Sequence, residues 1–182
     1  MEQSENYTSY KSILKVTLPL ILVSLSSYLM MSINRIVLAS VSADMMNAVI
    51  MSVTFINIFN NFFNDIIEKN CIFISQYYGN KQNDKVATCV WQMIFFSIFL
   101  IPVSLGMSFL SEKLHNLPEN LLVYGIPYQR LMFSCSFLYF IYTALVTFFI
   151  SQGKTYIISL SVILGCLINV ISSVTFVHNL NF

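Results

Sequence analysis

The chain has 182 residues, of which 57% are hydrophobic and only 9% are charged, and its mean hydropathy is +0.73. A soluble protein of this size needs a charged surface, which nine basic and eight acidic side chains do not supply. The net charge of +1 leaves no basic surface for nucleic acid, so we expect no nucleic-acid partner and a lipid bilayer as the principal one.

Five long apolar stretches follow a polar N-terminal tail over residues 1–12. A membrane-spanning helix needs about 20 predominantly apolar residues, and each stretch reaches that length. Continuous apolar runs exclude the alternating strands of a barrel, so helices must satisfy the backbone in lipid. We therefore predict an all-α, polytopic membrane helix bundle with one transmembrane domain over residues 13–182. The expected spans are residues 13–38, 46–70, 86–110, 121–150 and 156–178.

Basic residues gather in the segments that share one side of the membrane if the N-terminus is cytoplasmic. Six would lie on or near that side: Lys11, Lys15, Lys69, Lys81, Lys85 and Lys154. Three would lie on the opposite side: Arg35, Lys113 and Arg130. The positive-inside rule thus predicts a cytoplasmic N-terminus. The abundance of Ile, Asn, Lys and Phe is typical of an AT-rich bacterial genome, so we expect a multi-pass protein of a bacterial cell (inner) membrane.

Prolines and glycines predict where the helices bend or end. Pro102 is expected to kink the third span near its middle, and Pro127 to bend the fourth. Gly79 and Gly153 are expected to end the second and fourth spans.

Polar side chains in the second span recur at helical spacing. Six of them are 7, 3, 4, 3 and 4 residues apart: Asn47, Thr54, Asn57, Asn61, Asn64 and Glu68. This spacing places all six on one helix face, which must face protein or water because amides and carboxylates are costly against acyl chains. Two interpretations remain open: the polar face forms hydrogen bonds with other helices, or it lines an aqueous cleft. The first and fifth spans repeat the pattern more weakly, with Asn34 on one and Asn169 and Ser173 on the other.

Asp65 and Glu68 are neighbours on the second span, and Lys69 lies four residues after Asp65. At about 1.5 Å per residue, Asp65 is some 30 Å from Asp44, which suggests a position near the cytoplasmic boundary. The pair is then either an interfacial cluster of charges or a carboxylate site for a proton or cation.

The sequence offers little for catalysis. His115 and His178 are the only histidines, and neither an H-E-x-x-H nor a G-x-S-x-G motif occurs. No glycine-rich phosphate loop is present, and no two of the four cysteines have C-x-x-C spacing. We therefore expect no enzyme activity, no cofactor and no metal site. Transport without nucleotide hydrolysis would have to be coupled to an ion gradient.

Four segments in order resemble the N-terminal part of the multidrug and toxic compound extrusion (MATE) family. "LKVTLPLILVSLSSYLMMSINRIVLAS" is similar to the family's first helix, and "CIFISQYYGNKQNDKVATCVWQ" to the end of its second helix and the following loop. "FFISQGKTYIISL" is similar to the turn between helices 4 and 5, and "GCLINVISSVTFV" to helix 5. The likeness covers nearly the whole chain.

The resemblance implies the fold of a partial first lobe and a role in ion-coupled efflux. Family members have twelve helices in two lobes and export organic cations in exchange for protons or sodium. This chain departs from the family where many members carry an Asp, since it has Asn34 in helix 1 and Ser173 in helix 5. Neither side chain changes charge, so any coupling in this lobe would fall to Asp65 and Glu68, with Tyr139 or Tyr142 as hydrogen-bonding neighbours. The candidate cleft, ion or substrate residues are Asn34, Asn57, Asn61, Asn64, Asp65, Glu68, Tyr139, Tyr142, Asn169 and Ser173.

Three functions follow as alternatives. The first is the N-terminal part of a proton- or sodium-coupled multidrug antiporter, which is not expected to be competent alone because alternating access needs two repeats. The second is a truncated remnant or membrane-embedded interaction protein that transports nothing. The third is a relative of lipid-linked substrate flippases, for which Arg35 and Arg130 are the only candidate phosphate ligands.

Overall fold

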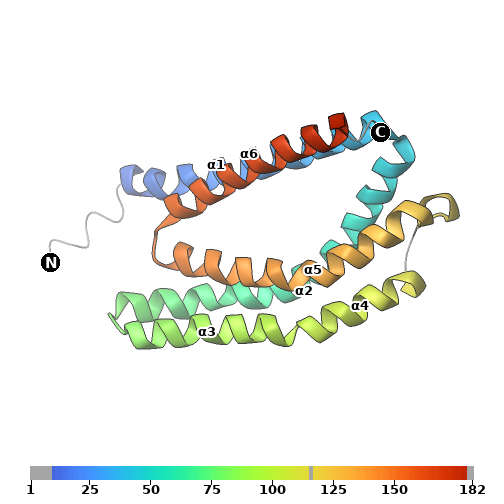
Figure 1. Ribbon diagram of the computed structural model, residues 1–182. Helices are drawn as coiled ribbons and strands as arrows, with labels where there is room; N and C mark the ends of the chain where they lie inside the picture. Colours follow the sequence, from blue (N-terminus) through green and yellow to red (C-terminus); the bar gives the residue numbers. More distant parts are fainter. Residues whose placement is uncertain (1–9, 115–116, 180–182) are drawn as a thin grey trace. The chain divides into compact units, whose positions relative to one another are not determined.

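The fold is entirely helical in the part of the chain that the computed structural model describes, residues 10–114 and 117–179 (Figure 1). The elements are α1 (Tyr10–Val41), α2 (Ala43–Gly79), α3 (Asn83–Phe99), α4 (Ile101–Leu114), the short 3-10 helix η1 (Glu119–Leu121), α5 (Leu122–Ser151) and α6 (Thr155–Asn179). Five helical segments are long and apolar enough to cross a membrane, with α3 and α4 forming one of them. The predicted all-α membrane fold is confirmed. Residues 1–9 of the expected polar tail lie outside the described residues, and α1 already begins at Tyr10.

Helix α2 ends at Gly79, where the sequence predicts its end, and so continues beyond the apolar span expected for residues 46–70. The charged residues Glu68 and Lys69 do not end it, because the apolar face continues beyond them: Ile67 is 1% exposed and Ile74 is fully buried. After Gly79 the chain turns at Lys81, which has a positive φ of 57°. Glu68 therefore lies about 17 Å before the end of its helix, at 1.5 Å per residue.

Pro102 interrupts the third span as expected. Helix α3 ends at Phe99 and α4 begins at Ile101, with Leu100 between them. Proline has no N–H to donate to the carbonyl four residues before it, and it disfavours helical geometry in the preceding residue. Pro127 lies inside α5, which continues past it to Ser151. Gly153 follows α5 with a φ of +72°, the left-handed conformation that glycine adopts most readily.

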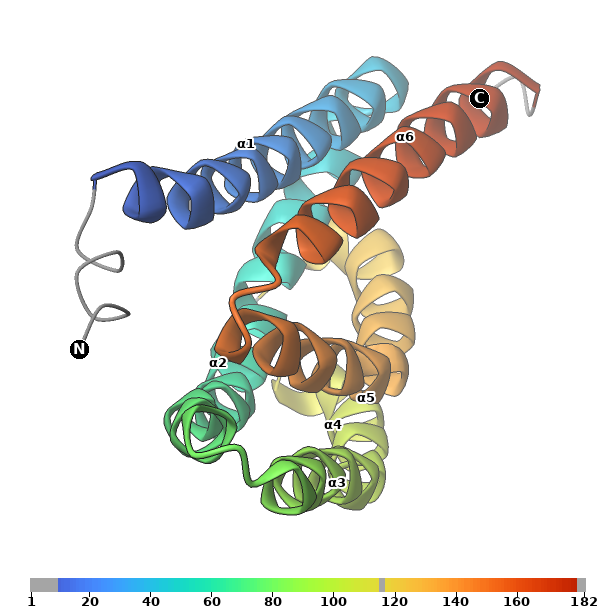
Figure 2. The same cartoon turned by 90° about the vertical axis from the view of Figure 1, so that its left-hand side faces the viewer.

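The chain divides into two compact units. The central unit comprises Val41–Gln152, and the terminal unit comprises Met1–Ser40 with Gly153–Phe182. The words central and terminal refer to position in the sequence and not in space. Helices α2, α3, α4 and α5 pack together in the central unit (Figure 2). Its core includes Ile67 and Ile74 of α2, Met93 of α3 and Phe140 of α5.

Aromatic rings join α2 to α5 within the central unit. Phe133 of α5 makes edge-to-face contacts with Phe55 and Phe59 of α2, at centroid distances of 5.9 and 5.4 Å. Phe63 lies in the same way against Phe140, at 5.9 Å. Edge-to-face pairs at these distances are favourable beyond their buried area. These contacts fix the register of the two helices that form the cavity described below.

The terminal unit is held together by hydrogen bonds about two helical turns apart. Three side chains of α6 donate hydrogen bonds to α1: Ser159 to the Pro19 carbonyl (3.0 Å), Cys166 to the Ser26 carbonyl (3.7 Å), and Ser173 to Asn34 Oδ1 (3.2 Å). Residue numbers rise together along both helices, so α1 and α6 run parallel. The donors are seven residues apart along α6, whereas the acceptors are seven and then eight residues apart along α1.

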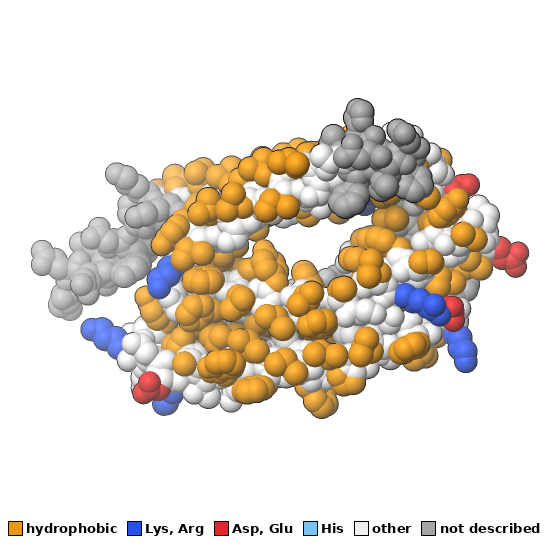
Figure 3. Space-filling view, in the orientation of Figure 1, with side chains coloured by type: hydrophobic (Ala, Val, Ile, Leu, Met, Phe, Trp, Pro, Cys, Tyr) orange, Lys and Arg blue, Asp and Glu red, His pale blue; other side chains and the backbone are white. Residues whose placement is uncertain are grey.

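The surface matches a lipid environment. Figure 3 shows hydrophobic side chains along the helices and charged side chains gathered toward the helix ends. Large apolar residues are freely exposed, for example Ile58 at 70%, Phe109 at 75% and Leu131 at 64%. In water such a surface would drive aggregation, whereas against acyl chains it costs nothing.

Candidate functional site: a polar cavity between two spanning helices

A cavity of about 240 Å³ lies between α2 and α5 in the central unit. Its walls are Val53, Ile56, Asn57, Asn60, Met132, Cys135, Ser136 and Tyr139. Asn60 lies about 26 Å from the start of α2 and about 28 Å from its end, and Ser136 is equally central in α5. The cavity is therefore at the middle of both helices, which is the depth of the bilayer midplane if the helices are centred in the membrane.

Polar groups in this cavity are not all hydrogen-bonded within the chain. Asn60 Oδ1 is a buried oxygen without a partner among the described residues. Ser136 is 3% exposed, and its hydroxyl donates to the Met132 carbonyl at 3.0 Å, so its lone pairs remain free to accept. An unpartnered buried amide oxygen costs free energy in lipid unless water or a ligand satisfies it. The cavity thus offers hydrogen-bond acceptors to a guest.

A carboxylate, that of Glu68, lies on the same helix just over two turns after Asn60. Asn64 Nδ2 donates to Glu68 Oε1 at 2.8 Å. Asn64 is 8% exposed, and its Oδ1 is a second buried oxygen without a partner in the described part of the chain. Glu68 itself is exposed. The amide holds the carboxylate in place, and the unpartnered oxygen leaves an acceptor beside it.

The terminal unit brings together two of the three polar residues predicted for α1 and α6, Asn34 and Ser173. Ser173 donates to Asn34 Oδ1 at 3.2 Å, and Asn169 lies one turn before Ser173 on the same helix face. Asn169 Oδ1 is buried without a partner among the described residues. This cluster contains amides and a hydroxyl, so it can bind through hydrogen bonds but cannot itself take up or release a proton near neutral pH.

The other predicted residues have different surroundings. Asn57 and Tyr139 line the cavity from opposite helices. Asn61 and Asp65 on α2 and Tyr142 on α5 are exposed, and none of them lines it. Asp65 forms no ion pair with Lys69; the salt bridge in the described residues joins Glu112 to Arg130. Of the predicted α2 stripe, only Asn64 is buried.

Apart from Asn64, the buried polar residues of α2 and α5 lie on faces that the sequence analysis does not single out. Gln129 is 1% exposed, and its Nε2 donates to Ser52 Oγ at 3.3 Å. Ser52 Oγ lies 3.5 Å from the Gly125 carbonyl, which it can reach as a donor. One sequence pattern could have predicted the buried polar face of α5: Gln129, Ser136 and Thr143 recur every seven residues, and all three are buried.

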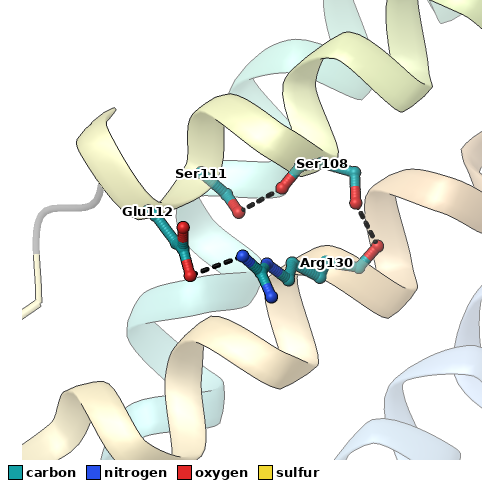
Figure 4. Close-up of polar contacts among 4 residues, drawn as sticks. All are labelled: Ser108, Ser111, Glu112 and Arg130. Atoms are coloured by element: carbon teal, nitrogen blue, oxygen red, sulfur yellow. Dashed lines mark hydrogen bonds and ion pairs between the residues drawn. The ribbon is translucent and has the colours of Figure 1, made fainter.

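Hydrogen bonds and an ion pair fix α4 to the first half of α5 (Figure 4). The Ser108 hydroxyl donates to the Arg130 carbonyl at 3.0 Å, and Ser111 donates to the Ser108 carbonyl at 2.7 Å. The Arg130 guanidinium pairs with Glu112 one turn further along α4. Arg130 therefore has a partner for its charge and does not present a free cation.

The fold and surface define the chain as a helical membrane protein with five segments able to span a bilayer. No protein-family model, curated protein or solved structure matches the chain.

Proposed function

We propose that this chain is part of an ion-coupled membrane transporter, related to the N-terminal part of a MATE-type organic-cation antiporter. The observation that carries the proposal is the cavity between α2 and α5, with its unpartnered Asn60 oxygen. Buried polar groups in the middle of spanning helices are costly and typically mark a transport pathway. Substrate sites of secondary transporters lie near this depth.

The lining favours an organic cation over an anion. None of its eight side chains carries a positive charge, and amide and hydroxyl oxygens accept hydrogen bonds from an ammonium group. The Tyr139 ring offers a cation–π contact. At about 240 Å³, the cavity is slightly smaller than the pockets that enclose drug-sized ligands, so it would hold one end of such a molecule.

Ion coupling through this unit would use Glu68. Its carboxylate is held by Asn64 and lies well inside α2, about 12 Å along the helix from the cavity residue Asn60. A proton or a sodium ion on Glu68 would remove the negative charge that attracts a cationic substrate. The ion and the substrate then cannot be held at the same time, and this mutual exclusion is the basis of exchange. Asn34 and Ser173 form a hydrogen bond with each other, but they supply no charge.

The test is binding of ethidium, an organic cation, to the purified full chain in lipid vesicles, because one part of a transporter is not expected to drive uptake alone. We expect protons or sodium ions to displace bound ethidium. Ser136→Leu, which fills the cavity, should abolish binding. Thr54→Val is the matched control, because Thr54 is exposed and its hydroxyl bonds only the Ile50 carbonyl of its own helix at 2.9 Å. Glu68→Gln, which lacks the negative charge, should weaken ethidium binding and remove its dependence on protons and sodium ions.

Ethidium binding that Ser136→Leu leaves intact would overturn the assignment of the cavity. No binding by the unmodified chain would favour the second interpretation, a membrane-embedded protein that takes no part in transport. The flippase alternative has less support, because no cationic side chain lines the cavity and Arg130 is paired with Glu112.

A further inference from the structure

A second hollow lies on the outside of the central unit, along α3 and the end of α5, and it is independent of the proposed transport cavity. It has a volume of about 440 Å³. Its walls are Asn83, Val86, Ala87, Val90, Trp91 and Ile94 of α3, with Phe148 and Gln152 at the end of α5. Trp91 is 58% exposed, so the groove is open at the surface.

The groove has polar residues at one end and apolar residues along the rest of its length. Asn83 and Gln152 lie at the end where α3 begins and α5 ends, and all the other lining residues are apolar. From Asn83 to Ile94 the groove follows α3 for about 17 Å. One leaflet of the hydrocarbon core is about 15 Å thick, so the groove has the length and polarity of a single phospholipid chain with its head group at Asn83.

Positive charge and free N–H groups gather at the polar end. The first N–H groups of a helix have no partner within it, and Gln82, which precedes α3, makes no side-chain cap. Lys81 and Lys85 flank this helix start, and Lys85 Nζ lies 5.4 Å from the centroid of the Tyr77 ring. Asp84 is the one acidic residue among them, so the segment has a net positive charge. Helix N-termini and lysines both favour a phosphate group.

We propose that this groove binds an anionic phospholipid, with one acyl chain against Trp91 and Phe148 and the head-group phosphate at the start of α3. The apolar walls account for the chain, and the two lysines with the uncapped helix start account for a preference for anionic over zwitterionic head groups. Asn83 and Gln152 donate hydrogen bonds to the phosphate oxygens.

Trp91 is the only tryptophan in the chain, so its fluorescence reports on this groove alone. The purified full chain is placed in phosphatidylcholine vesicles that contain increasing fractions of either dibrominated phosphatidylglycerol or dibrominated phosphatidylcholine, whose bromines quench tryptophan at contact. We expect phosphatidylglycerol to quench at about fivefold lower mole fraction, the preference that one net lysine charge supplies near a membrane surface.

Three variants identify the cause of the preference. The double variant Lys81→Gln with Lys85→Gln should abolish or reverse the preference, because Asp84 then leaves a net charge of −1, whereas Asp84→Asn should increase it several-fold. Ala87→Leu narrows the groove without changing charge and should weaken quenching by both lipids. Lys113→Gln, at the far end of α4, is the control that should change nothing, and helix content by circular dichroism confirms that each variant is folded.

Equal quenching by the two brominated lipids would overturn the proposal, as would a preference that survives removal of both lysines. The absence of quenching by either lipid would show that protein, and not lipid, covers the groove. Because none of these readouts measures transport, their failure leaves the proposed function of the inner cavity unaffected.

Discussion

Gly125 is the position where one added methyl group should disturb the packing of α2 against α5. A Cβ built there would lie 2.3 Å from Leu117 Cδ1 and 3.2 Å from Ser52 Oγ. Leu117 is only 8% exposed, so its side chain has little room to withdraw. Overpacking a well-filled interior costs about 1–3 kcal/mol. Alanine in a helix is itself favoured over glycine by about 1 kcal/mol, which offsets part of that cost.

We therefore expect Gly125→Ala to lower the free energy of unfolding by up to about 2 kcal/mol. Gly106→Ala on α4 is the matched control, because a Cβ there meets nothing within 4 Å. It should gain up to about 1 kcal/mol from helix propensity alone. The difference between the two variants, about 1–3 kcal/mol, isolates the packing cost.

The assay is reversible unfolding in mixed micelles with increasing dodecyl sulfate, followed by far-ultraviolet circular dichroism. A double-mutant cycle adds Leu117→Ala, which removes the colliding methyl groups and should make Gly125→Ala nearly neutral or favourable. If Gly125→Ala is as stable as Gly106→Ala in the unmodified background, the close packing of α5 against Leu117 and α2 is wrong.

Three further perturbations test other contacts of the central unit. Gln129→Leu should change the free energy of unfolding by less than about 1 kcal/mol, since the 3.3 Å bond to Ser52 is long and Gln129 Oε1 has no partner among the described residues. A loss above about 2 kcal/mol would show that this oxygen is satisfied. Glu112→Gln should cost about 0.2–1 kcal/mol at low salt and less at 1 M salt, because both partners in its pair with Arg130 are about half exposed; a salt-independent cost would contradict this. Pro102→Ala restores the missing N–H and should increase hydrogen-exchange protection at the α3–α4 junction; unchanged protection would refute the assigned cause of the break.

The sequence alone was sufficient for the helical fold, because run length and continuity of apolar residues reflect the thickness of the bilayer directly. Pro102 and Gly153 also acted as predicted, since their effects on the backbone are local. Gly79 ends α2 as predicted, but the apolar span expected for residues 46–70 is shorter than the helix. Glu68 and Lys69 resemble the polar boundary of a span, whereas Ile74 packs into the core six residues after Glu68, and the local sequence does not show that contact.

The site was only partly predictable for a related reason. Helical periodicity shows which residues share a face but not which face packs against a neighbour. Asn57 and Asn64 belong to the same predicted stripe, yet Asn57 is exposed and Asn64 is buried, because the packed face of α2 passes between them. Asn60 lies on that packed face, and only the position of α5 opposite it identifies it as a site residue.

The hydrogen bonds between α1 and α6 have a consequence for the order of events during synthesis. The residues that α6 needs on α1 enter the membrane well over a hundred positions before their partners, as Pro19 and Ser159 illustrate. The central unit, by contrast, is one continuous segment and can pack while the ribosome is still adding α6. Helix α1 must therefore remain in the bilayer with its small and polar contact surface unpaired for most of translation. During that interval it is the part of the chain most open to chaperones, proteases and wrong helix partners.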